Sequence, residues 1–438
     1  MVSLQQRDFF IWAGLLIFVL FIPVAKPPST LGEILAILAW IPGFFHQETR
    51  SNRLQNLKSR PFLLFLPAFF LLHLIGMAWT SDLGQGLKEL NMQHYLLSIP
   101  LIFASINRNP KKEKHLLAAF LIANLVASCL TIFIRQTDIP LLKAELYLPS
   151  PFIARPRASL FYAFSLFLLL EIPWHLSLSR KQKIFWGLAT FIQAMALINL
   201  EGRTGQIAFA LVLPVWMVMR LVQKHKILWF TAFTILVSLL AWLSYLYVGN
   251  IQRRFREAFD EVTAYQEGFK DRNANDTSFA RRFVFMEKSW EVFTEHSLFG
   301  VGTGDLQKEV YPLFDNHPLK IEPNKPHHQF LEIAVKFGIF GLIFFLAGWL
   351  WQLIIARPPT RILFLCFSLL SFVSMMTEST LDTQAGISFF VFMGSLLLLM
   401  ACTKQGLAPS GGLHQAEANI VAPETATSDL PGKNNARA

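Results

Sequence analysis

Long apolar runs alternate with short polar segments along most of the chain. The runs are about 16 to 25 residues long, enough to cross ~30 Å of hydrocarbon at a rise of ~1.5 Å per residue. They lie at residues 8–25, 31–46, 62–79, 93–106, 115–135, 158–178, 183–200, 206–223, 227–248, 331–355, 361–377 and 384–402. This pattern predicts an all-α polytopic membrane protein with about twelve transmembrane helices.

The basic residues of the connecting segments fall in every second segment. In chain order they are Arg50, Arg53, Lys58 and Arg60; then Arg108, Lys111, Lys112 and Lys114; then Arg180, Lys181 and Lys183; then Arg220, Lys224 and Lys226; then Arg357 and Arg361. Cytoplasmic loops carry such an excess of Lys and Arg. We therefore expect these loops and both termini to be cytoplasmic, and the other loops to face outward.

Composition supports a membrane protein and argues against a nucleic-acid partner. Hydrophobic residues make up 53% of the chain and charged residues only 16%, whereas soluble proteins have about 25% charged residues. The formal net charge is +10, but the cations sit between apolar runs instead of forming a basic patch. The cysteines Cys129, Cys366 and Cys402 fall in apolar stretches without a pairing pattern, so we expect free thiols.

One long polar segment, at about 250–328, interrupts the apolar pattern. Aromatic and aliphatic residues recur there at helical spacing, first over 255–269 and again over 279–293, which predicts a partly helical outer loop. The chain then divides into helices at 1–248, an outer loop domain at 249–328, further helices at 329–403, and a tail at 404–438. The tail has too few apolar residues to form a core, so we expect it to be disordered and cytoplasmic.

Several arginines lie on the predicted outer side, where the orientation rule disfavours positive charge. They are Arg155, Arg157, Arg203, Arg253, Arg254, Arg281 and Arg282. An anion-binding site is one explanation. Capping of helix-end carbonyls, an interfacial role, or, for Arg203, pairing with Glu201 is another. Adjacent helical residues point about 100° apart, so at most one of Arg281 and Arg282 is expected to face a common site.

Known metal and nucleotide motifs are missing from the sequence. It has no His-Glu-x-x-His, no paired-cysteine motif, no P-loop and no Gly-x-Gly-x-x-Gly run. The Gly-Val-Gly-Thr-Gly run at 300–304 is more typical of a tight turn before a helix near Asp305 than of an anion nest. Arginine and histidine remain, a combination that suits a phosphorylated substrate and proton transfer without a metal.

The pair His327-His328 stands directly before the apolar run that begins near 331. Histidine titrates near neutrality and can accept a proton from an attacking hydroxyl. The positive end of the following helix would disfavour an imidazolium and keep a neutral base available. Helix capping or interfacial anchoring explains the pair equally well.

These motifs together resemble a known family. The run His-His-Gln-Phe-Leu-Glu from His327, followed by Gly-Ile-Phe-Gly at 338–341, resembles the His-Asn/Ser/Gln-x(9)-Gly-x-x-Gly signature of the O-antigen ligase and polymerase family. Upstream, Arg282 and the Gly-Val-Gly-Thr-Gly run are similar to the arginine, helix and glycine turn that precede this histidine. Arg203 in Glu-Gly-Arg-Thr-Gly sits like that family's arginine at the outer end of a mid-chain helix. The resemblance covers roughly 155–345.

The resemblance implies a GT-C-like glycosyltransferase of the bacterial inner membrane, with its site on the periplasmic side. The donor would be an O-antigen glycan on undecaprenyl diphosphate, and the acceptor a sugar hydroxyl of lipid A-core. His327 would be the base, with Arg203 and Arg282 as diphosphate ligands and no metal, ATP or other cofactor. A second histidine replaces the usual residue after the first, so His328 stays a candidate. Arg155, Arg157 and Arg281 are further phosphate candidates.

Other functions share most of these features. A polymerase of the same family would use a second carrier-linked glycan as acceptor, and a further member would ligate the glycan to protein. A transporter of lipid-linked glycans would also have about twelve helices and outward arginines, but should place ionisable groups in mid-membrane. His73 and Glu171 are among the few candidates for such groups.

Overall fold

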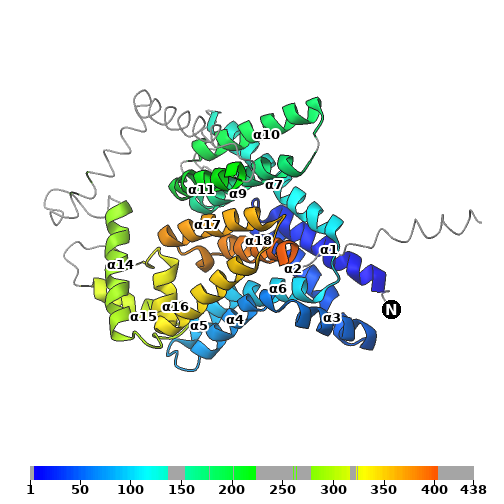
Figure 1. The fold of residues 1–438 in the computed structure, drawn as a ribbon. Helices are drawn as coiled ribbons and strands as arrows, with labels where there is room; N and C mark the ends of the chain where they lie inside the picture. Colours follow the sequence, from blue (N-terminus) through cyan, green and yellow to red (C-terminus); the bar gives the residue numbers. More distant parts are fainter. Residues whose placement is uncertain are drawn as a thin grey trace, which may run out of the picture. The chain divides into compact units, whose positions relative to one another are not determined.

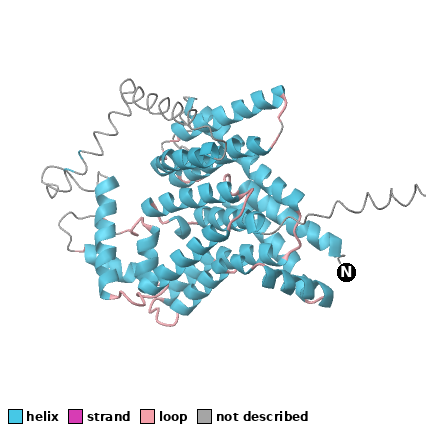
Figure 2. Cartoon of the chain, in the orientation of Figure 1, coloured by secondary structure: helices cyan, strands magenta, loops and turns pink. Residues whose placement is uncertain are grey.

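The computed structural model describes residues 4–136, 153–176, 178–200, 202–222, 260, 263, 278–315, 322 and 324–402. The described residues form helices and no strand (Figure 2), and they belong to one compact unit, Met1–Cys402. The predicted span at 227–248, the amphipathic pattern at 255–269, Glu201 and the tail at 404–438 lie outside the described residues.

The helices follow one another in the order shown in Figure 1. They are α1 (Leu4–Phe21), α2 (Lys26–Trp40), α3 (Gln47–Ser59), α4 (Phe65–Gly76), α5 (Leu83–Gln93), α6 (Tyr95–Ser105), α7 (Pro110–Gln136), α9 (Arg155–Glu171), α10 (Arg180–Asn199), α11 (Arg203–Val222), α14 (Ser278–Glu295), α15 (Leu306–Val310), α16 (Gln329–Ile355), α17 (Arg361–Thr377) and α18 (Gln384–Cys402). Short 3₁₀ turns lie at η1 (Ile41–Phe44), η2 (Pro61–Leu63), η3 (Ile172–His175), η5 (Tyr311–Phe314) and η6 (Thr380–Asp382).

Each apolar run that falls on described residues is helical. By length and composition, 3 of the described helices could each cross a membrane, namely Pro110–Phe133, Gln329–Ile355 and Gln384–Cys402. The pair α2 and α3 is bent by 111° and counts as one further candidate. These findings confirm a helical membrane-type protein, while the number of about twelve spans stays a prediction.

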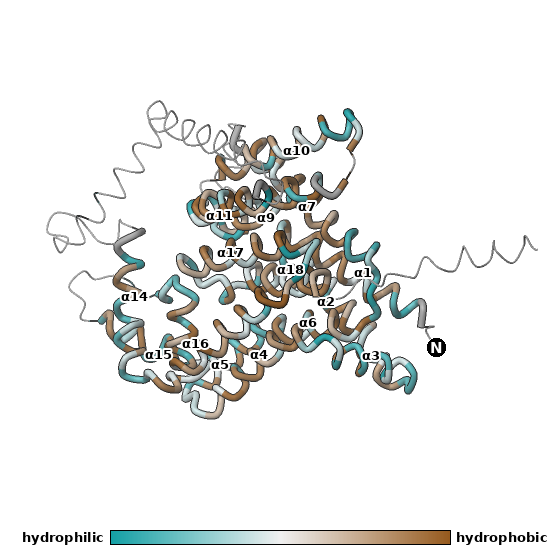
Figure 3. Tube along the Cα trace, in the orientation of Figure 1, coloured by the Kyte–Doolittle hydropathy of each residue, from teal (hydrophilic) through white to brown (hydrophobic). Residues whose placement is uncertain are grey.

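The core is built around α18, which packs against α6 and α17. The α18 side chains of Phe389 and Phe392 are almost completely buried, and the Phe389 ring lies 5.5 Å from that of Phe367 on α17. Burial of large aromatic side chains supplies most of the packing energy of such a core. The core helices are mostly brown in Figure 3, whereas the basic first turns of α10 are teal.

The two predicted sets of loops occupy opposite ends of the helices. In the basic set, Asn56 donates to Ser105 O at 2.9 Å, and Arg60 donates to Ile106 O at 2.7 Å. In the other set, the backbone N–H groups of Ser81 and Asp82 each donate to the Asp305 carboxylate at 2.7 Å. In Figure 1, α3 and the N-terminus lie at one side and α14 and α15 at the other. The alternation of charge along the sequence therefore sorts the loops correctly.

The glycine run packs against a break in α16, and we call residues 297–304 the glycine strap. Val301 N–H and Gly302 N–H donate to Val335 O and Lys336 O, both at 2.9 Å. The backbone φ is +70° at Gly300 and +66° at Gly338, and a Cβ on Gly338 would lie 2.1 Å from Leu298 O. Only glycine fits both conditions. The glycine run is thus a turn that holds α16, as the sequence predicted.

Candidate active site

The short loop between α17 and α18 places Glu378 at the meeting point of three other elements. Arg282 on α14 brings Nη2 to 2.6 Å from Glu378 Oε1 and also donates from Nη1 to Thr377 O at 3.2 Å. Arg157, in the first turn of α9, brings Nη1 to 3.5 Å from Glu378 Oε2. His327 brings Nδ1 to the same oxygen, also at 3.5 Å. These four residues are called the site cluster below.

His327 adopts an uncommon backbone conformation just before α16. Its φ is +51°, in the left-handed region that residues with a Cβ seldom occupy. Its ring lies 5.9 Å from that of Phe285 on α14. Neighbouring contacts must hold this conformation, because residues in such regions cost on the order of 1–3 kcal/mol each.

His328 has a different role in the structure. It is the N-cap of α16, and its Nδ1 accepts a hydrogen bond from Leu331 N–H at 3.1 Å. Burial lowers the pKa of His328, which agrees with a neutral ring whose Nδ1 acts as acceptor. The capping explanation therefore fits His328, whereas His327 lies against the charged groups.

The site cluster presents its cations to the surface and keeps its carboxylate behind them. The exposed fraction of the side chain is 35% for Arg282 and 28% for His327, but only 3% for Glu378. Burial alone would raise the pKa of Glu378, but His327, Arg157 and Arg282 outweigh burial and hold it below its usual value. One carboxylate cannot balance both guanidinium groups, so the cluster suits an anionic ligand.

Arg157 retains hydrogen-bonding capacity. Its Nε is buried and has no hydrogen-bond partner among the described residues. Burial lowers the pKa of Arg157, partly offset by the Glu378 charge, yet a guanidinium stays protonated at biological pH. A buried donor without a partner costs free energy, and an oxygen-rich ligand could satisfy it.

Arg203 lies next to the start of α9, beside Arg155. Gly205 N–H donates to Ser159 Oγ at 3.0 Å, and a Cβ on Gly202 would lie 2.8 Å from Arg155 O. The first turns of α9 and α11 are therefore in direct contact. The side chains of Arg155 and Arg203 are both exposed, and no printed distance joins either one to Glu378.

Of the neighbouring arginines on α14, Arg282 contacts Glu378 and Arg281 does not. Arg281 is half-buried, and its Nε has no hydrogen-bond partner among the described residues. The expectation that only one of the two faces a common site therefore agrees with the geometry. Arg253 and Arg254 lie outside the described residues.

A second cluster, called the buried network below, lies beside the site cluster. It consists of Glu89 on α5, Lys325, Glu332 and Lys336 on α16, and Asp382 in η6. Lys336 Nζ lies 2.7 Å from Glu332, 3.1 Å from Glu89 and 3.9 Å from Asp382. Lys325 Nζ lies 3.1 Å from Glu89 and also pairs with Asp382.

The carboxylates of the buried network approach one another as metal ligands do. One oxygen from each of Glu89, Glu332 and Asp382 lies within 4.8 Å of the others. The Lys325 and Lys336 ammonium groups already contact the same oxygens and supply the compensating positive charge. A divalent cation would have to displace them, so this arrangement suits a lysine-neutralised network better than a metal site.

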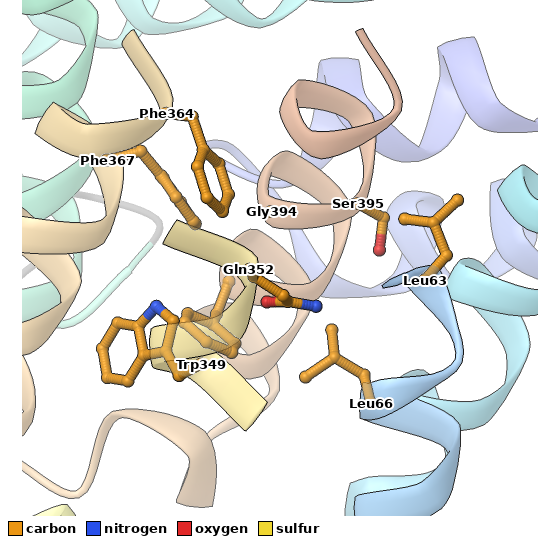
Figure 4. Close-up of a pocket in the computed structure, with 9 residues that line it drawn as sticks. Leu63, Leu66, Trp349, Gln352, Phe364, Phe367, Gly394 and Ser395 are labelled. Atoms are coloured by element: carbon orange, nitrogen blue, oxygen red, sulfur yellow. The ribbon is translucent and has the colours of Figure 1, made fainter. Parts of the chain in front are cut away.

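A small cavity elsewhere in the core does not have the size of a substrate site. Its volume is ≈ 10 Å³, about enough for one water molecule. Figure 4 shows Gln352 and Ser395 among the apolar side chains that line it. Gln352 donates to Phe62 O at 3.0 Å, which places the cavity at the end of α16 farthest from His327.

The two ionisable residues that a transporter might use have structural partners. His73 is buried between the rings of Phe69 and Phe337, and its Nδ1 lies 3.0 Å from Phe69 O. Glu171 is buried and pairs with Arg220, and it accepts from Trp216 Nε1 at 2.9 Å. Neither residue lines an open path among the described helices.

Sequence reasoning missed Glu378 and the buried network. It concentrated on outward cations, although Glu378 is an acidic residue in a short outer loop between two apolar helices. Glu332 and Lys336 stand four positions apart within a predicted span, and this i,i+4 spacing is the signal that could have indicated a buried pair. Arg157 was a weaker candidate, yet it contacts Glu378.

Comparison with known proteins agrees with this site. Residues 188–346 match the model of a family described as O-antigen ligase. A search of the curated proteins found none that matches the chain. The matched segment contains Arg203, Arg282 and His327, whereas Arg157 and Glu378 lie outside it. Through residues 188–346, the chain belongs to the O-antigen ligase family.

Proposed function

We propose that the protein is a glycosyltransferase that moves an O-antigen glycan from undecaprenyl diphosphate to a sugar hydroxyl of lipid A-core. The reaction takes place on the periplasmic side of the bacterial inner membrane, in a GT-C-like bundle with both termini in the cytoplasm. The observation that carries this proposal is the convergence of His327, Arg157 and Arg282 on one buried carboxylate. The family match supports the reaction type in general.

The arginines hold the donor diphosphate. A guanidinium binds phosphate oxygens in a bidentate fork and stabilises charge that develops on the leaving group. In the absence of donor, Glu378 holds Arg157 and Arg282 in place. The exposed Arg155 and Arg203 extend the positive surface and guide the donor toward the cluster.

His327 accepts the proton of the acceptor hydroxyl. Glu378 lies on the Nδ1 side of the ring, which favours the tautomer with a proton on Nδ1 and a free lone pair on Nε2. As the hydroxyl oxygen bonds to the anomeric carbon, its proton passes to Nε2. The bond from that carbon to the diphosphate breaks, and its electron pair leaves with the diphosphate. Direct displacement predicts inversion at the anomeric carbon.

Neither ATP nor a metal ion is needed for this scheme, because the donor is already activated and the guanidinium groups balance the diphosphate charge. Activity is therefore expected to survive a chelator. Loss of activity with EDTA that Mg²⁺ or Mn²⁺ restores would contradict the scheme.

The test uses purified full-length protein in detergent with carrier-linked glycan as donor. Lipid A-core, a second carrier-linked glycan and an acceptor protein are offered together. A lipid A-core product that is lost in His327→Ala and kept in His328→Asn supports the proposal. A lengthened carrier-linked glycan identifies a polymerase instead, a glycosylated protein identifies a protein ligase, and transport into vesicles without a covalent product identifies a transporter.

A further inference from the structure

The two loops that carry the site cluster are both anchored by the buried network. The loop at 324–328 carries His327, and its Lys325 pairs with Asp382 and with Glu89 at 3.1 Å. The loop at 378–382 carries Glu378 and ends at the same Asp382. The buried network therefore joins the residue proposed as base to the carboxylate that it faces.

Backbone contacts reinforce this connection between the loops. Gln329 Oε1 accepts from Leu381 N–H at 2.6 Å, and Gln93 Nε2 donates to Leu381 O at 3.1 Å. His327 is thus held by Lys325 on one side and by the His328 cap and Gln329 on the other. Such contacts are what a residue at a φ of +51° requires, because the conformation is unfavourable by itself.

We propose that the Lys325–Asp382 ion pair, backed by Glu89, Glu332 and Lys336, is a positioning element that sets His327 against Glu378. The proposal rests on the proposed function for its kinetic consequence, but its geometric consequence is independent of any activity. It assigns a role to Glu89, which lies on α5 far from the other site residues in the sequence.

The low exposure of the network fits positioning better than ligand binding. The exposed side-chain fraction is 5% for Lys336, 1% for Glu332 and 8% for Asp382. A substrate cannot reach groups that are covered to this degree. Lys325 is 20% exposed and stands at the edge of the network that faces His327.

The charge balance explains why the network constrains the loops. Its three carboxyl groups face two ammonium groups, so both lysines are shared and neither can leave without exposing unpaired buried charge. Burial, and then the nearby Glu332 carboxylate, raise the pKa of Asp382 to about 8. Asp382 also acts on Arg157 through its charge, which connects the network to the donor-binding side of the site.

The experiment compares Lys325→Met with Lys308→Met in the full-length protein. Lys308 is an exposed outer lysine whose Nζ donates to Ser81 Oγ at 2.6 Å, outside the network. Positioning predicts that Lys325→Met lowers kcat about tenfold to hundredfold while the donor KM stays within about twofold, because small misplacements of a reacting group mainly affect the chemical step. Lys308→Met is expected to match the wild type.

A second readout needs no substrate. Diethyl pyrocarbonate modifies neutral histidines, and mass spectrometry compares its rate at His327 with that at the exposed His46 before α3. Lys325→Met is expected to raise the relative rate at His327 several-fold, and Lys325→Arg, which keeps the charge, to return it toward the wild-type value. Size-exclusion chromatography restricts the comparison to folded protein.

Each outcome decides one proposal. If Lys325→Met leaves the His327 modification rate unchanged, or if Lys308→Met changes it equally, the positioning role is wrong. If the wild type transfers glycan to none of the acceptors, the proposed function fails, while the modification rates still decide the positioning role.

Discussion

Two clusters of charged residues lie side by side at the outer ends of α16 to α18, and they differ in exposure and in charge balance. In the site cluster, Arg157, Arg282 and His327 share one carboxylate, and the cations reach the surface. In the buried network, carboxylates outnumber lysines and almost all the groups are covered. Both clusters use the same kinds of side chain.

The difference shows how the same residue types serve binding or scaffolding. An exposed excess of positive charge can gain free energy from an anion, since its own carboxylate does not satisfy it. A covered network gains nothing from a ligand and is costly to break, because any lost partner leaves a buried charge. The four predictions that follow separate these two roles.

The largest effect is expected from removal of the proposed base. His327→Ala should lower kcat about 10²–10⁴-fold, the usual contribution of a general base. His328→Asn should stay near the wild type, because an Asn side chain can still accept from Leu331 N–H as an N-cap. Steady-state rates of both variants measure the difference. A greater loss in His328→Asn would reverse the assignment of the two histidines.

Breaking the buried network should reduce stability more than activity per folded molecule. Lys336→Met leaves its carboxylates unpaired and should cost about 3–5 kcal/mol of stability. Glu332→Gln combined with Lys336→Met removes both members of the 2.7 Å pair and should recover much of the loss. Thermal unfolding in detergent measures both variants. Equal losses in the single and double variants would show that pairing is not what matters at Lys336.

The arginines should show the opposite behaviour to the network lysine. Arg282→Lys and Arg157→Lys keep the charge but lose the bidentate fork, so we expect kcat/KM for the donor to fall about tenfold to hundredfold. Unfolding temperatures should change little for Arg282, whose side chain is 35% exposed. Arg281→Lys is the matched control, as it does not contact Glu378. A fall as large in that control would remove the distinction between the two arginines.

The smallest effect concerns pH and Asp382. Its pKa is about 8 in the folded protein, against an ordinary value of 3.8. Between these values the folded protein retains a proton that the unfolded chain has lost, so this group's contribution to stability is full below about pH 4 and is lost as pH rises toward 8. Asp382→Asn should remove that slope.

Unfolding temperatures from pH 4 to 9 test this, with an expected divergence on the order of a few °C. Parallel curves for the wild type and Asp382→Asn would show that Asp382 does not carry the proton. The charged or titratable groups that act on Asp382 or that it acts upon are Lys325, Lys336, Glu332, Glu89, Tyr311 and Arg157.

Much of the fold followed from local patterns. Apolar runs became helices because a helix satisfies its own backbone hydrogen bonds, and α14 formed over the predicted pattern at 279–293. Helix ends were less certain. The run at 62–79, for example, became a 3₁₀ turn and the shorter α4, Phe65–Gly76. Free cysteines were also confirmed, although Cys129 is exposed on α7.

The candidate site was only partly predictable. Arg282 and His327 stood out as cations on the wrong side for the orientation rule, and the structure brings both to Glu378. Glu378 itself could not be chosen, because its importance depends on which residues surround it. The same is true of Glu89, whose partners Lys325 and Lys336 are more than two hundred positions away.

The sequence by itself determined the helices, the sorting of loops to two ends, and the segment with the candidate chemistry. Hydrophobic length and charge act locally, so they can be recognised along the chain. Only the tertiary structure decided that His327 faces Glu378 while His328 caps α16. Adjacent side chains with identical chemistry differ only in direction, and direction is set by the break in backbone conformation at His327 and by the network that holds it.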